Sequence, residues 1–181
     1  MLNSIKSNKN SNVYMLVLTG IFAGIVTVCS WITVPLPFTQ VPINLAVLGV
    51  LLAGGCLGSK YGSLSILIYI LLGAVGIPVF AGFGAGLGTL AGPTGGYIVG
   101  YILCAAIAGL GARCKHPIRL ALCMLLGVAA CYALGTLWYA HLMQTTIWAA
   151  LALCVIPFIP CDALKIAAAV FLVTRLRRLL N

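Results

Sequence analysis

The chain has 181 residues, of which 63% are hydrophobic and 6% are charged, and its net charge is +9. Average soluble domains carry about 25% charged residues, so this composition excludes an ordinary soluble domain and indicates an integral membrane protein. The ten basic residues are scattered between apolar segments and form no basic stripe. We therefore expect no nucleic-acid partner, with membrane lipid as the surroundings.

The N-terminal part of the chain predicts a polar arm and a first membrane span. Residues 1–12 are polar and basic and are expected to form a short cytoplasmic arm. The apolar segment from Val13 to Val34 is too long for a signal-peptide core. It contains Gly20, Ala23 and Gly24, small residues at helical spacing that allow another helix to approach closely.

Two further spans precede a glycine-rich segment. Three prolines between residues 35 and 42 make the next link short and extended. A second span is expected at 43–57, a tight basic turn at 58–62, and then a third span that ends near Ile77. Residues 80–97 contain seven glycines and no charge. Irregular backbone of this kind is tolerated near a membrane only where protein covers it or where it lines a cavity.

The C-terminal half predicts three more spans, at 95–112, 120–140 and 161–176. The segment 141–160 is ambiguous, because its apolar part, 147–159, is too short to cross a membrane and contains a proline. We expect a re-entrant or surface helix there.

The distribution of charge supports six spans. With the N-terminus inside, all basic residues except Lys165 fall on the inner side and the outer links hold none; the inner residues are Lys6, Lys9, Lys60, Arg113, Lys115, Arg119, Arg175, Arg177 and Arg178. A seventh span would move the C-terminal arginines outside. The expected fold is thus an all-α, six-transmembrane-helix bundle, a single domain from 13 to 181, in the cell (inner or plasma) membrane with both termini cytoplasmic.

The sixth span carries the most unusual feature of the sequence. Asp162 is the only acidic residue, and Lys165 follows three positions later on the same helix face. Arg175 lies thirteen positions after Asp162, about 20 Å along a helix. The pair is therefore expected within the outer half of a hydrocarbon core about 30 Å thick. Ionisable residues inside a membrane mark functional sites by default. The alternative, that the two charges only neutralise each other, stays open.

The surroundings of this pair suggest a small ligand. Spans four and six both begin on the outer side, where free N–H groups and positive dipole ends favour an anion or a polar group. Thr94 is expected to cap span four, and Gly95 and Gly96 to allow close backbone approach. Six aromatic residues are candidate apolar walls or else interface anchors: Tyr97, Tyr101, Phe80, Phe83, Phe158 and Trp148.

Enzyme chemistry is not indicated. One carboxylate excludes a two-carboxylate protease site, the lack of glutamate excludes HExxH, and no Walker motif is present, so the chain is not expected to hydrolyse ATP itself. The eight cysteines include no CxxC pair and lie mostly in apolar spans. We expect them to be small core residues, with no metal site and no cofactor.

Several motifs occur together in one order: VPIN (41–44), LLAG (51–54), LGSKYGSLS (57–65), LLGAVGIPVFAGFGAGLG (71–88), GPTGGY (92–97) and PFIPCDALKIA (157–167). Over residues 15–178 the chain resembles the BioY family, the biotin-binding S components of energy-coupling factor (ECF) transporters. The resemblance implies a bundle of the ECF S-component type that captures biotin from outside and delivers it inward. Gly20, Ala23 and Gly24 would then meet the transmembrane T component, which couples to two ABC-type ATPase subunits.

The resemblance also implies a biotin site on the outer side of the bundle. Its expected residues are Asp162, Lys165, Tyr97, Gly95, Gly96, Thr94, Phe80, Gly84 and Asn44. The chain departs from the family pattern at Ala46, where members often carry glutamine, and at Gly84, where some carry asparagine. Asn44 is a candidate substitute for these polar groups.

Three alternatives remain open at the level of sequence: capture of another small vitamin, an autonomous facilitator or channel that needs no ATPase, and a structural subunit that binds no small ligand. The orientation of biotin is open as well. Asp162 would accept ureido N–H groups while Lys165 or a helix N-terminus attracts the carboxylate, or the roles would be reversed.

Overall fold

Helices account for most of the computed structural model, which describes residues 2–35, 37, 39–112 and 116–180. The elements are α1 (Leu2–Trp31), β1 (Thr33–Val34), β2 (Ile43–Asn44), α2 (Ala46–Ala74), η1 (Ala81–Phe83), α3 (Gly86–Ala91), α4 (Gly95–Gly111), α5 (Pro117–Met143), α6 (Ile147–Cys154), η2 (Ile156–Phe158) and α7 (Ile159–Leu180). The all-α class expected from the composition is confirmed, with one two-stranded antiparallel ribbon added.

The first helix begins earlier and ends sooner than expected. Residues 2–12 of the expected arm are the helical start of α1, and residue 1 lies outside the described part of the chain. The helix ends at Trp31, and β1 then pairs with β2, Thr33 opposite Asn44 and Val34 opposite Ile43. This ribbon was not expected, because its pairing brings together residues on either side of the proline-rich link.

The second and third expected spans are joined by a sharp bend within α2. Gly58 has φ 80 and ψ 177, a non-helical conformation that only glycine adopts readily. Beyond the bend the chain folds back on itself, and a Cβ on Gly62 would lie 2.8 Å from the Cα of Gly54. The basic turn predicted at 58–62 is therefore a real change of direction.

Close backbone contacts join the central helices. A Cβ on Gly54 would meet the carbonyl oxygen of Ala105 in α4 at 2.5 Å, and one on Gly127 in α5 would meet that of Cys104 at 2.8 Å. Small residues at such crossings let helices pack without intervening side chains. The resulting core includes Val50, Ile66 and Met124, each fully buried.

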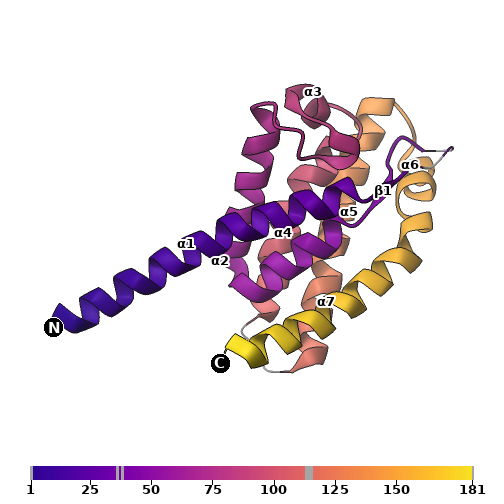
Figure 1. Cartoon of the computed structure of the whole chain (residues 1–181). Helices are drawn as coiled ribbons and strands as arrows, with labels where there is room; N and C mark the ends of the chain where they lie inside the picture. The colour runs from indigo at the N-terminus through magenta and orange to yellow at the C-terminus, as the bar shows by residue number, and fades with distance from the viewer. Residues whose placement is uncertain (1, 36, 38, 113–115, 181) are drawn as a thin grey trace.

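Four segments of the described chain are long and apolar enough to cross a membrane: Asn12–Trp31, Ala46–Ala74, Pro117–Met143 and Ile147–Leu176. Gly95–Gly111 is a shorter apolar helix. Figure 1 shows the start of α1 and the end of α7 toward one end of the bundle, and α3, β1 and α6 toward the other. The small elements thus gather at the end opposite the termini.

The two irregular segments are short helices and turns. Within 80–97 lie η1 and α3, and Gly82 and Gly86 have positive φ. Within 141–160, α6 spans eight residues and is separated from α7 by η2, which contains Pro157. The sixth span begins at Ile159, slightly earlier than expected.

Candidate functional site

A cavity of about 240 Å³ is lined in part by the small elements, with residues from the link between β1 and β2, from η1 and from α3. This volume lies just below the range of about 300–1,000 Å³ that is usual for sites of drug-sized ligands. The residues that line it come from many parts of the chain, beginning with the link between β1 and β2 and ending with α7. The lining residues are Gln40, Val41, Pro42, Asn44, Val47, Tyr69, Phe80, Ala81, Thr89, Thr94, Tyr97, Ile98, Tyr101, Cys104, Val128, Cys131, Tyr132, Cys154, Phe158, Asp162 and Lys165.

The Asp162–Lys165 pair lies on this cavity, and its two members share one face of α7, as their spacing predicts. The Nζ of Lys165 donates to Oδ1 of Asp162 at 2.6 Å, and the two residues are 7% and 4% exposed. Asp162 is in the first turn of α7, where the helix dipole favours a negative charge. The pair is therefore a buried ion pair on a cavity wall.

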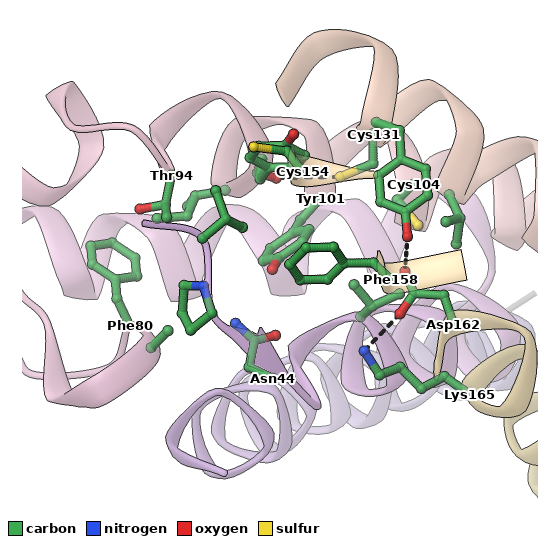
Figure 2. A pocket seen from close by; sticks show the side chains of 18 of the residues that line it. Asn44, Phe80, Thr94, Tyr101, Cys104, Cys131, Cys154, Phe158, Asp162 and Lys165 are labelled. Atoms are coloured by element: carbon green, nitrogen blue, oxygen red, sulfur yellow. Dashed lines mark hydrogen bonds and ion pairs between the residues drawn. The ribbon is translucent and has the colours of Figure 1, made fainter. Parts of the chain in front are cut away.

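A third residue, Tyr132 of α5, completes this cluster. Its hydroxyl donates to Oδ2 of Asp162 at 2.5 Å, so that each carboxylate oxygen has a partner of its own. The dashed lines in Figure 2 mark both contacts. Sequence reasoning missed Tyr132, because nothing in the spacing along the chain relates residue 132 to residue 162.

Polar and aromatic groups line the rest of the cavity. Figure 2 shows Asp162 and Lys165 on one side and Phe80 and Thr94 on the other, with Tyr101 and Phe158 between them. Asn44 also faces the cavity; its Oδ1 accepts from the backbone N–H of Ala46 at 3.1 Å. The site thus combines donors and acceptors with a largely apolar wall.

Six of the nine expected site residues line the cavity: Asp162, Lys165, Tyr97, Thr94, Phe80 and Asn44. Of the other aromatic candidates, Tyr101 and Phe158 line it too. Phe83 and Trp148 do not, being 61% and 82% exposed. Phe83 instead packs against Trp31, with ring centroids 5.1 Å apart.

The three expected glycines do not line the cavity, but they lie in close contacts between the elements around it. A Cβ on Gly95 would collide with the backbone of Leu90, and one on Gly96 with the side chain of Trp138. Gly84 accepts from the N–H of Phe80 at 3.0 Å through its carbonyl. These residues allow close packing of the elements that carry the lining side chains.

Thr94 occupies the N-cap position of α4, as expected, but only this position is confirmed. The Thr94 side chain makes no capping hydrogen bond, and the N–H of Gly95 donates to the carbonyl of Gly92 at 3.0 Å. At the start of α7, the N–H of Ile159 likewise donates to Val155 at 3.2 Å. Because the preceding turns occupy these N–H groups, they are not free for a ligand.

Three cavity cysteines were also missed. Cys104, Cys131 and Cys154 come from α4, α5 and α6 and are nearly fully buried. Their positions in apolar segments indicated burial but not a cavity. Within the described residues, no three His, Cys, Asp or Glu side chains gather in a way that would hold a metal ion.

The three residues of α1 that were expected to contact a partner lie on different faces of the helix. Gly20 and Gly24 are exposed, and a Cβ on either would meet nothing within 4 Å. Ala23, by contrast, is 2% exposed and packs in the core. The expectation that Ala23 meets a partner is therefore wrong for this conformation, because the helix turns that residue toward its own bundle.

Comparison with known proteins agrees with this architecture. Residues 5–181 match the BioY family. The chain is 39% identical over 168 residues to "Biotin transporter BioY" of Thermotoga maritima, covering 91% of this chain and 96% of that protein. It is 42% identical over 160 residues to "Probable biotin transporter BioY" of Pyrococcus horikoshii, covering 88% and 94%.

Among solved structures, the chain is similar to the crystal structure of the S component for biotin from an ECF-type ABC transporter. The TM-score is 0.87 at 27% sequence identity, over 93% of each chain. The match to the family extends from α1 to the C-terminus, so it includes every element that lines the cavity. The chain belongs to the BioY family.

Proposed function

We propose that this chain is the membrane-embedded biotin-binding subunit of an ECF transporter, and that it captures biotin in the cavity described above. The observation that carries the proposal is a buried Asp162–Lys165 pair on the wall of this cavity, in a chain of this family. The similar S component for biotin adds support. The role is binding and delivery, not catalysis.

The chemistry of the cavity suits biotin. Biotin has a ureido ring with two N–H donors and a carbonyl acceptor, an apolar thioether ring and a chain that ends in a carboxylate. Asp162 has lone pairs for N–H groups, Lys165 has N–H donors for an oxygen or a carboxylate, and Asn44 adds an amide. Phe80, Tyr97, Tyr101 and Phe158 provide an apolar wall for the ring and the chain.

The topology that we propose has six spans and both termini on the cytoplasmic side. The bend at Gly58 divides α2 into two helical arms that fold back on each other, which supports counting it as two crossings. Lys60, next to the bend, and Arg119, at the start of α5, then lie on the same side as the termini, as the positive-inside rule favours. The cavity, which β2, η1 and α3 help to line, then lies toward the other, outer end.

Delivery inward requires partners. The chain is proposed to work with a transmembrane T component and two ABC-type ATPase subunits, and the exposed face of α1 around Gly20 and Gly24 is the proposed contact with the T component. Small residues there would let a partner helix approach closely.

The first test is a biotin titration of the purified, detergent-solubilised chain by itself, next to the Asp162→Asn and Lys165→Ala variants. Tight binding that is lost in folded variants supports the proposal. No binding by a folded wild-type chain contradicts it, and competition by another vitamin would redirect it. Uptake into vesicles without ATPase subunits would instead favour an autonomous facilitator.

A further inference from the structure

Tyr132 is the one member of the charged cluster that comes from a different helix. Asp162 and Lys165 lie three residues apart on α7, so their contact is made within that one helix. Tyr132 lies on α5, half-buried, and its hydroxyl reaches Oδ2 of Asp162 at 2.5 Å. This hydrogen bond therefore joins the carboxylate to a second helix of the cavity wall.

Lys165 and Tyr132 bind different oxygens of the Asp162 carboxylate, and this arrangement determines which acceptor sites remain for a ligand. An ionised carboxylate only accepts hydrogen bonds and has about four lone-pair sites, two on each oxygen. With Lys165 on Oδ1 and Tyr132 on Oδ2, each oxygen keeps an acceptor site for a further donor. Without the hydroxyl, the carboxylate could rotate so that both oxygens turn to Lys165.

We propose that Tyr132 is a positioning residue for ligand binding: its hydroxyl holds Asp162, and through it Lys165, in the orientation that meets biotin. The inference rests on the proposed function, since it names a residue that prepares the same site. Holding a charged pair in place before the ligand arrives lowers the cost of ordering it upon binding.

A binding experiment compares Tyr132→Phe with a matched control, Tyr139→Phe. Tyr139 also lies on α5 and is 5% exposed, but it does not line the cavity. Both changes remove one hydroxyl from the same helix. We expect Tyr132→Phe to weaken biotin binding about tenfold, equal to about 1.4 kcal/mol, and Tyr139→Phe to leave it unchanged.

Two analogues separate positioning from a general loss of structure. Biotin methyl ester lacks the carboxylate, and biotin methylated on a ring nitrogen lacks one N–H donor. We expect each modification to weaken binding to the wild type, and we expect Tyr132→Phe to reduce this loss for the group that meets the cluster. Wild-type affinity in Tyr132→Phe, or an equal loss for biotin and both analogues, would overturn the inference.

A measurement without ligand tests the same contact independently. Because Asp162 is the only acidic residue of the chain, aspartate labelled with ¹³C at the side-chain carboxyl, supplied so that it is not converted to asparagine, yields a single carboxylate signal. Tyr132→Phe should move this NMR resonance and Tyr139→Phe should not. An unmoved resonance in Tyr132→Phe overturns the positioning role. A moved resonance in Tyr132→Phe, combined with a wild type that binds no biotin, contradicts only the proposed function.

Discussion

Variants that remove one or both charges of the buried ion pair can distinguish its contribution to stability from its contribution to ligand binding. We consider three variants: Asp162→Asn, Lys165→Met, and the two changes combined. Each single change leaves one charge buried without its partner, at 7% exposure for Lys165 or 4% for Asp162. The double variant removes both charges, and its asparagine keeps a carbonyl oxygen that can accept from Tyr132.

The expected magnitudes follow from this burial. Breaking a buried pair by removing one partner costs about 3–5 kcal/mol, and a charged residue at the centre of a membrane helix costs about 2.5–3.5 kcal/mol by insertion scales. Each single variant should therefore lose about 3 kcal/mol of unfolding free energy. The double variant should lose at most about 1 kcal/mol, because replacing both charges is often neutral.

The assay combines unfolding in detergent with a biotin titration of the same samples. We expect the double variant to unfold like the wild type yet to lose biotin affinity by at least about tenfold, since hydrogen bonds to charged groups contribute about 1.5–3 kcal/mol. A double variant as unstable as the singles would refute the burial argument. A stable double variant with wild-type affinity would mean that the two charges only neutralise each other.

Three further predictions concern glycines. Gly58→Ala should lower the unfolding free energy by about 1–3 kcal/mol in chemical denaturation, because φ 80 and ψ 177 strain any other residue; an unchanged midpoint would contradict this. Gly135→Ala should weaken biotin binding in titration without removing a cavity group, because its Cβ would displace the ring of Tyr97; unchanged affinity would count against Tyr97 as a wall. Gly20→Leu and Gly24→Leu should leave biotin binding by the isolated chain intact but reduce uptake in cells that contain the T component and ATPases, and normal uptake would remove this face as the contact.

Sequence reasoning succeeded where the relevant contacts are local. The pairing of Asp162 with Lys165 follows from a spacing of three residues on one helix. It failed where a contact joins distant segments, as in the ribbon between Thr33 and Asn44 and the hydrogen bond from Tyr132. Neither involves a periodic pattern that a single segment displays.

The partner motif illustrates the same limit. A stretch of small residues predicts that another helix approaches closely, but not which helix. Ala23 meets the protein's own core, while Gly20 and Gly24 face outward. Which face of α1 is buried depends on how α1 packs against α2, and this packing is a property of the assembled bundle.

By itself, the sequence determined the membrane class, the helical segments and the presence of one isolated carboxylate with a lysine beside it. These follow from composition and from helical periodicity, which act within one segment. Only the tertiary structure decided that these charges face a cavity and which other side chains share it. The reason is that the cavity is the space left between helices from distant parts of the chain, and its shape depends on crossings set by close contacts such as Gly54 with Ala105 and Gly127 with Cys104.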